Sequence, residues 1–218
     1  MLILGAVAAC ICRAQPTIKT PAELSRDLRG DPGTAWFPAG SSRLPSPANG
    51  QQRPTGESVS IAQLRHKVPK PAQKALARAL RLSEGGDHEK AAAELQTAIL
   101  RDPKFADAYG QLGVEYGNLK RFTEAETVLR RSLELDPNSW RAEYDLGLIL
   151  YYTGNLAEAE QSVRRAVRDS GQDALAQLFL GCLLYQHAES RAEGLRYLQS
   201  AARTLPDAKN LLAKLPAP

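Results

Sequence analysis

Small and apolar side chains recur with a period of about 34 residues along the C-terminal two thirds of the chain. Gly113, Gly147 and Gly181 are separated by one such period each, and Ala79 stands one period before the first of them. A large apolar or aromatic residue follows each of these positions by three residues, and an alanine or glycine lies near the twelfth. This pattern predicts paired helices, because only a small residue lets two backbones approach while larger side chains fill the neighbouring grooves.

The period predicts four helix-turn-helix repeats inside a domain over 58–218, at about 72–105, 106–139, 140–173 and 174–206. Gly85-Gly86-Asp87 marks the first turn, and Pro103 ends the first repeat because a residue without an N–H stops a helix. In the fourth repeat the pattern is shifted by one residue. This shift predicts a one-residue insertion in the turn near His187–Arg191, which a loop absorbs at little cost.

Both ends of such a stack need polar capping elements. Asp207 is expected to be the N-cap of a final helix over 207–215. Ser60 and Gln63 have the spacing of a capping box. They predict a short helix containing Ile61, Leu64 and Val68, which would lie over the first repeat.

Residues 72–206 resemble four tetratricopeptide repeats, a family with this same period. The resemblance implies an all-α fold, an α-solenoid of about four such repeats with a disordered N-terminal segment, in a protein of bacterial type. Ala79 in place of glycine and Glu143 in place of a bulky apolar residue depart from the family pattern, as does the shifted fourth turn. These departures concern local packing rather than the fold.

Proline and glycine concentrate in the segment that precedes the repeats. Nine of the 14 prolines fall between Pro16 and Pro71, and the segment has few large apolar residues. It buries too little apolar surface to offset the entropy of ordering, so 15–57 is predicted to be a disordered linker. Trp36 and Phe37 are its only aromatic residues, and they are either an exposed pair or a short docking motif.

The first fourteen residues contain an unbroken apolar run from Leu2 to Cys12. The run is shorter than the roughly 20 residues that span a bilayer, and it fits the apolar region of a signal peptide over 1–14. Val7-Ala8-Ala9-Cys10 also resembles a lipobox, which would place a lipid anchor at Cys10. We therefore expect an exported protein that is periplasmic or secreted, and a lipid-anchored protein is one form of this expectation. The alternative is a cytoplasmic protein.

Signals of catalysis and metal binding are missing from the sequence. His66, His88 and His187 lie far apart, and none has a histidine or cysteine partner at ligand spacing. Gly110, Gly113 and Gly117 follow no predicted strand, so helix packing explains them better than dinucleotide binding. We expect no enzyme activity, no cofactor and no metal site. His88 and Cys182 are expected to have structural roles.

Basic side chains recur at helical spacing before the first turn. Lys70, Lys74, Arg78 and Arg81 form one stripe, and no acidic residue lies between Ser58 and Ser83. Such a stripe could meet nucleic acid or an anionic membrane surface, but a solvated outer face explains it more simply. No nucleic-acid partner is expected.

In the tetratricopeptide family the first helix of each repeat lines a concave groove. The family's chaperone-binding members place lysine and asparagine there, where this chain has Leu76 and Leu80, so a C-terminal carboxylate is a disfavoured ligand. The other matching positions form an apolar, tyrosine-rich surface. They are Gly110, Val114, Gly117, Asn118, Tyr144, Leu148, Tyr151, Tyr152, Leu178, Cys182, Tyr185 and Gln186.

These features predict an interaction module that binds a polypeptide partner in its groove. Tyrosine suits peptide recognition because it combines contact area with a hydrogen-bonding group. Packing between repeats would explain the same tyrosines, and the sequence leaves both roles open. The rival functions are a self-associating scaffold and an accessory subunit of an envelope complex.

Overall fold

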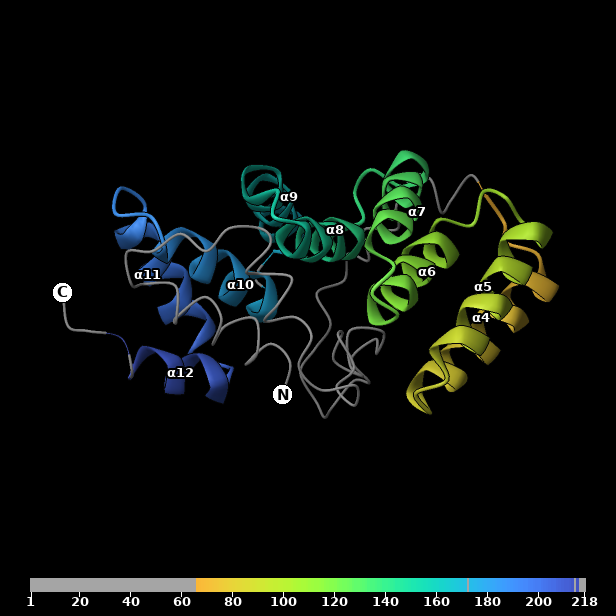
Figure 1. The fold of residues 1–218 in the computed structure, drawn as a ribbon, viewed down its shortest axis with the longest axis horizontal. Coiled ribbons are helices and arrows are strands. Elements are labelled where there is room, and N and C mark those ends of the chain that lie inside the picture. Colours follow the sequence, from red (N-terminus) through yellow and green to blue (C-terminus); the bar gives the residue numbers. More distant parts are fainter. Residues whose placement is uncertain (1–65, 172, 214, 216–218) are drawn as a thin grey trace, which may run out of the picture. The chain divides into compact units, whose positions relative to one another are not determined.

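The computed structural model describes residues 66–171, 173–213 and 215. Within these ranges the chain forms nine helices and no strand (Figure 1). The helices are α4 (Lys70–Glu84), α5 (His88–Arg101), α6 (Ala106–Asn118), α7 (Phe122–Leu135), α8 (Trp140–Thr153), α9 (Leu156–Asp169), α10 (Ala174–Tyr185), α11 (Arg191–Ala201) and α12 (Pro206–Leu212). The predicted signal peptide over 1–14, the lipid site at Cys10, the linker over 15–57 and the capping box at Ser60 and Gln63 lie outside the described residues.

The chain divides into two compact units, and the boundary between Asp145 and Leu146 falls inside α8. We call their described parts the 66–145 unit and the 146–215 unit. Helix pairs form both: α4 packs on α5 and α6 on α7 in the first, and α10 packs on α11 in the second (Figure 1). The all-α class predicted from the repeat period is confirmed.

The 66–145 unit is held together by small residues at its helix crossings. Ala79 on α4 and Ala91 on α5 are fully or almost fully buried, which lets the two helices of the first pair approach closely. In the second pair, a Cβ added at Gly113 would collide with the Leu129 side chain of α7. The small residues at the repeat positions are therefore required by packing, as the period predicts.

In the 146–215 unit, Gly147 and Gly181 likewise allow two helices to approach closely. A Cβ at Gly147 would stand 2.5 Å from Cγ2 of Val163, and one at Gly181 would stand 2.8 Å from Cγ of Leu198. Gly194 on α11 is tighter still, because its Cβ would lie 2.7 Å from the backbone nitrogen of Tyr185 and 2.8 Å from the carbonyl oxygen of Gly181. The backbones of α10 and α11 are thus in direct contact.

The turns inside three successive repeats share one backbone conformation. Gly86, Lys120 and Gly154 occupy equivalent positions of these turns and have φ values of 81°, 61° and 87°. Glycine adopts this left-handed region without the steric penalty that other residues carry. The second turn therefore holds a lysine in a conformation for which the first and third use glycine.

Two helix starts near the C-terminal end differ from the expectations. The prediction of Asp207 as an N-cap is wrong, because α12 begins at Pro206 with Leu205 as its N-cap. Proline is favoured in the first turn, where its missing N–H needs no partner, and this moves the helix start forward. The Asp173 side chain does cap a helix, because it accepts hydrogen bonds from the backbone N–H groups of Leu175 and Ala176 at the start of α10.

The connection between α10 and α11 is longer than the turns of the earlier repeats. It runs over 186–190, compared with 85–87, 119–121 and 154–155. Ser190 closes it by donating a hydrogen bond from Oγ to the carbonyl oxygen of Leu184 at 2.9 Å. The extra length lies where the sequence predicts an insertion. At the other end, His66–Pro69 is not helical, so the short helix predicted through Val68 does not reach these residues.

Candidate functional site

In the 66–145 unit, five of the predicted groove residues lie on α6 and on the start of α8. Gly110, Val114, Gly117 and Asn118 follow one face of α6, and Tyr144 is on α8. Val114, Gly117 and Tyr144 are buried, whereas Gly110 and Asn118 are half-buried. A Cβ at Gly110 would stand 3.4 Å from Oγ of Ser132, an ordinary contact, so close packing does not require glycine there.

In the 146–215 unit, the other seven lie on the rest of α8 and on α10, or directly after it. Leu148, Tyr151, Leu178 and Cys182 are buried. Tyr152, Tyr185 and Gln186 are half-buried and keep part of their surface exposed. Cys182 is in no disulfide.

Tyr151 packs across the repeat boundary. Its ring meets that of Phe179 on α10 edge to face, with centroids 5.7 Å apart, and it meets the ring of Tyr152 at the same distance. Edge-to-face pairs of this kind stabilise a core beyond the area they bury. The packing role is therefore supported at Tyr151, and a direct role of its ring in binding stays a prediction.

The sequence analysis missed a set of polar side chains on the same helices. Asp107 and Gln111 lie one turn apart on α6, and Arg141 and Asp145 occupy the equivalent positions on α8, one repeat later. Asp145 is only 7% exposed, and burial raises the pKa of its carboxyl to about 7 against the opposing effect of Arg141. Burial on a helix face cannot be read from one sequence, so no motif revealed this residue.

Two histidines bond to buried carboxylates in the 66–145 unit. Nδ1 of His88 lies 2.8 Å from Oε2 of Glu115, which is almost fully buried on α6. Nε2 of His66 lies 2.7 Å from Oδ2 of Asp102, which is also buried. His88 thus has a structural role, as expected, although it acts through a polar contact between repeats. Among the described residues, no group of histidine, cysteine, aspartate and glutamate side chains could hold a metal ion.

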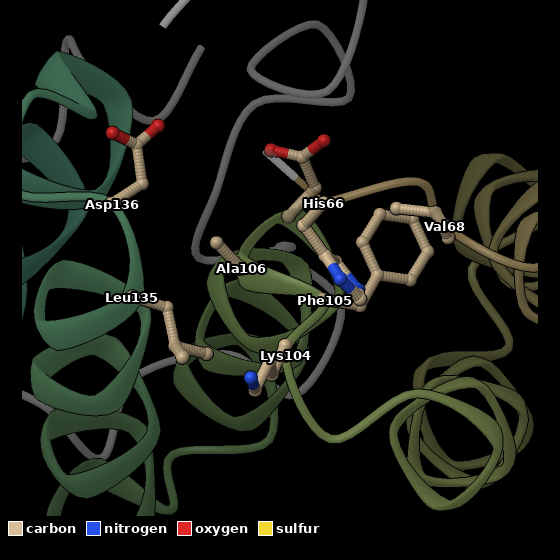
Figure 2. Close-up of a pocket in the computed structure, with 8 residues that line it drawn as sticks. His66, Val68, Lys104, Phe105, Ala106, Leu135 and Asp136 are labelled. Carbon is tan, nitrogen blue, oxygen red and sulfur yellow. The ribbon is translucent and has the colours of Figure 1, made fainter. Parts of the chain in front are cut away.

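A cavity of about 140 Å³ opens between the segment before α4, the start of α6 and the end of α7 (Figure 2). Figure 2 shows Leu135 and Asp136 on the α7 side of this cavity, and Phe105 and Ala106 at the start of α6. Desolvation by neighbouring groups and the nearby Asp136 raise the pKa of Asp107, an exposed residue that also lines the cavity. Lys104 lines it as well, so the charge of the walls is mixed and favours no ligand class.

Several arginine side chains bond to acidic neighbours, and one of them belongs to the basic stripe on α4. Nη2 of Arg78, in the stripe on α4, lies 2.7 Å from Oε2 of Glu94 on α5. Arg130 bonds to Glu126 on its own helix, and Arg164 links α9 to Glu193 of α11 at 2.7 Å. The bond of Arg78 reduces the charge that the stripe offers to an anionic partner. In the part of the chain that the structure describes, no helix combines the length and hydropathy needed to cross a membrane.

The family model for the tetratricopeptide repeat (TPR) matches the chain three times, over 76–139, 111–174 and 144–209. Together these matches cover more than half of the chain. The chain belongs to the tetratricopeptide repeat family. The TPR resemblance found in the sequence is thereby confirmed, and with it the fold class. TPR units generally mediate protein–protein interaction and are rarely catalytic.

Solved TPR structures show the same fold at low sequence identity. MamA from Desulfovibrio magneticus RS-1 is 24% identical, with a TM-score of 0.56 over 64% of this chain and 78% of that one. The first TPR domain of Spaghetti (RPAP3), bound to the HSP90 peptide SRMEEVD, is 18% identical, with a TM-score of 0.51 over 52% of this chain and 90% of that one. At these identities the likeness concerns the fold alone.

One curated relative is anaphase-promoting complex subunit 3 from Schizosaccharomyces pombe. It is 23% identical over 128 residues, which is 59% of this chain. The match spans only 19% of the length of that subunit. The similarity therefore concerns one segment of a much longer protein.

Proposed function

We propose that this TPR protein is a non-enzymatic interaction module that binds a polypeptide through the first helices of its repeats. Family membership is the observation that carries the proposal, because TPR units generally bind proteins or peptides. The Spaghetti TPR domain bound to an HSP90 peptide is an example with the same fold. The described residues offer no metal cluster as a rival basis for function.

Within the predicted surface, the half-buried residues are the proposed contact group. In the 146–215 unit these are Tyr152, Tyr185 and Gln186, and in the 66–145 unit they are Gly110 and Asn118. Tyrosine is enriched among residues that dominate binding energy, since its ring gives contact area and its hydroxyl gives a hydrogen bond. The guanidinium carbon of Arg191 lies 5.3 Å from the Tyr185 ring centroid and adds a polar neighbour to this ring.

The buried members of the surface are proposed to shape its floor. Leu178 is 1% exposed and Tyr151 is 4% exposed, so neither offers much area to a partner. A C-terminal carboxylate is not the proposed ligand, because Leu76 and Leu80 stand where chaperone-binding relatives carry lysine and asparagine. An internal polypeptide segment fits the apolar and aromatic surface better.

A binding assay with matched variants tests the proposal. Partners captured from the native source by the full chain would be compared with those captured by the Tyr152→Ala/Tyr185→Ala variant. We expect the variant to lose at least tenfold in affinity with its melting temperature nearly unchanged. The control is Tyr197→Ala on α11, a half-buried tyrosine of a second helix. Equal loss in both variants, or retained binding by the double variant, would refute the proposed surface.

The second candidate is a scaffold or accessory subunit of an envelope complex. The similarity to a subunit of the anaphase-promoting complex favours it, since that relative carries its matching segment inside an assembly. Light scattering at micromolar concentration tests for self-association. A monomer at all concentrations would remove the self-associating form and leave the accessory subunit to be tested by co-purification.

We also propose that the protein is exported, on the basis of the apolar run Leu2–Cys12 and the proline-rich segment after it. Mass spectrometry of the N-terminus tests this directly. A mature N-terminus at Gln15 supports secretion, and a lipidated Cys10 supports a membrane anchor. An intact Met1 on protein recovered from the cytoplasm would contradict export.

A further inference from the structure

One side of α4, the first helix of the first repeat, is exposed and basic. Lys70, Lys74, Ala77 and Arg81 are all exposed, and their spacing of four, three and four residues places them on one side of the helix. The side chains of Lys70, Lys74 and Arg81 make no ion pair or hydrogen bond with any described residue. We call these three residues the basic face. Its charges are available to a partner.

One repeat later, the first helix uses the same positions for packing. The residues that replace Lys74, Arg78 and Arg81 are all buried, and they are Ala108, Leu112 and Glu115. Their helix, α6, packs on α5 of the preceding repeat. Glu115 contacts His88 of α5 directly, at 2.8 Å. In the second repeat this side of the first helix therefore faces the preceding repeat.

The fourth repeat, in the 146–215 unit, has the same arrangement. Its first helix, α10, packs on α9 of the preceding repeat. The residues of α10 that replace Lys74, Arg78 and Arg81 are all buried, and they are Ala176, Leu180 and Leu183. In the described part of the chain, α4 packs extensively on α5 alone. The basic face therefore lies on the side of the helix that takes a neighbouring helix in later repeats.

Shape and charge together define what fits this side of α4. Ala77 is small, so a second helix can approach between Lys74 and Arg81 as it does at the alanines of later repeats. Four exposed carboxylates at helical spacing on that second helix would match the spacing of the cations. The residues directly before α4 supply no such countercharge, because no acidic residue lies between Ser58 and Ser83.

We infer that the basic face binds an acidic amphipathic helix of a partner protein, which packs on α4 as a second helix packs on α6 and α10. This surface goes beyond the proposed function, because it uses none of the contact group around Tyr152 and Tyr185. Lysine and arginine both bond to carboxylates, and arginine does so with two parallel N–H groups. Exposed ion pairs are individually weak, so the affinity comes from several of them and falls as salt rises.

The arrangement of charges favours a helix over other anionic partners. Glu94 of α5 bonds to Arg78 at 2.7 Å and so lies beside the basic face. It would repel the continuous negative charge of a nucleic acid backbone or of an anionic bilayer. The carboxylates of a helix stand at discrete positions, so they can meet the cations and avoid Glu94.

Two synthetic helical peptides of about 20 residues test the inference on the full chain. One carries glutamate along one face, and the other carries glutamine at the same positions. Fluorescence anisotropy measures the binding of both. We expect the acidic peptide to bind at least about tenfold more tightly than the neutral one, with an affinity that decreases as the salt concentration increases.

Charge reversal locates the site. The variant Lys70→Glu/Lys74→Glu/Arg81→Glu should lose at least about tenfold in affinity for the acidic peptide. The matched control reverses three exposed basic residues of the 146–215 unit and changes the net charge equally. These residues are Arg196, Arg203 and Lys209. Melting curves check that each variant is folded, and glutamine at the same three positions of α4 repeats the test if the reversal variant is not.

Several outcomes would overturn the inference. These are equal binding of the two peptides, no binding of either, and an equal loss in the reversal variant and its control. Tighter binding of phosphatidylglycerol vesicles or a DNA duplex than of the acidic peptide would assign the basic face to a membrane or to nucleic acid. Self-association that the reversal variant abolishes would assign it to a second copy of the chain.

A variant of the groove separates the inference from the proposed function. Tyr152→Ala/Tyr185→Ala should bind the acidic peptide as tightly as the wild-type chain does. If it loses this binding, the peptide lies in the groove, so the inference is refuted while the proposed function stands. If it keeps this binding and also keeps the captured native partner, the proposed surface is refuted while the basic face stands.

Discussion

The two compact units fill one pair of repeat positions in opposite ways. In the 146–215 unit the pair is Tyr151 and Phe179, two buried rings in edge-to-face contact. One repeat earlier, in the 66–145 unit, the same two positions are Gly117 and Asp145. An apolar filling stabilises the fold, whereas the charged form of a buried carboxylate is disfavoured by desolvation. The contrast teaches that equivalent positions of two repeats can hold side chains of opposite polarity without a change of fold.

The largest expected effect comes from breaking the aromatic pair. Phe179→Ala should destabilise the protein by about 3–5 kcal/mol, as is usual when a buried aromatic ring is removed. Tyr151→Ala should have a similar effect, and the double variant should cost less than the sum of the two because they share one contact. Urea denaturation of the three variants measures this. A loss below about 1 kcal/mol for Tyr151→Ala would return that tyrosine to the candidates for a binding anchor.

The buried carboxylate of Asp145 should make stability depend on pH. Its pKa of about 7 in the folded state is above the value of about 3.9 expected when unfolded. The folded state therefore binds the proton more tightly, and this contribution to stability is complete below about pH 4 and is lost as pH rises through 7. Relative to Asp145→Asn, the wild-type chain should lose on the order of 3 kcal/mol between pH 4 and pH 8.

Denaturation curves of both proteins across this pH range provide the measurement. Among the described residues, Arg141 is the charged group with an electrostatic effect on Asp145, and Asp136 and Arg141 have such an effect on Asp107. Both proteins retain them, so the difference between the proteins isolates Asp145. Parallel pH profiles would show that its carboxyl is solvated, and would weaken the contrast between the units.

The next largest loss of stability is expected when the polar contact between His88 and Glu115 in the 66–145 unit is broken. His88→Leu should destabilise the protein by about 2 kcal/mol, because it leaves the buried Glu115 without this partner. The double variant His88→Leu/Glu115→Met should recover most of the loss, since an apolar pair needs no donor. Thermal melting of both variants tests this. A double variant less stable than the single one would mean that Glu115 matters for another reason.

Substitutions at two helical glycines, one in each unit, test whether tight packing around a glycine makes a larger side chain destabilising. Gly194→Ala should cost about 1–3 kcal/mol, because the added methyl meets backbone atoms of α10 that cannot rotate away. Gly110→Ala should be neutral or stabilising by up to about 1 kcal/mol, since alanine favours the helix and its Cβ meets only Ser132 Oγ at 3.4 Å. Chemical denaturation distinguishes them. Equal effects would contradict the packing described for α10 and α11.

The smallest effect concerns the turn that uses a lysine where its neighbours use glycine. Lys120→Gly should stabilise the protein by about 1 kcal/mol, because glycine adopts the positive φ of 61° without a steric penalty. Gly86→Ala, at the equivalent position with φ of 81°, should destabilise by a similar amount. Opposite shifts in melting temperature confirm the shared turn conformation. Shifts of the same sign would show that side-chain contacts outweigh the backbone.

The sequence predicted the parts of this molecule that repeat. Gly113, Gly147 and Gly181 were found from their period alone, because each faces the same kind of crossing. The cap at Asp173 was missed and the one at Asp207 was wrong, since the start of a helix depends on local competition with residues such as Pro206. Family positions indicated the candidate surface, but they do not separate the half-buried Tyr152 from the buried Tyr151.

The polar side chains Asp107, Gln111, Arg141 and Asp145 on α6 and α8 could not be recognised from the sequence for a different reason. From the sequence alone, an aspartate at position 145 is expected to be a solvated charge, because the sequence does not show that its helix face is covered. Only the three-dimensional arrangement reveals that Asp145 is buried and that Arg141 stacks on Trp140. The period gives the positions of these residues, but it does not show which of them are buried.

The backbone contact between α10 and α11 also limits how this sequence can drift during evolution. Neither Gly181 nor Gly194 can gain a single methyl group without meeting main-chain atoms of the other helix. A side chain at either glycine would be accepted only if the axes of α10 and α11 moved apart. Substitutions in this repeat should therefore accumulate on exposed positions of α11, such as Gln199, while the crossing itself stays unchanged.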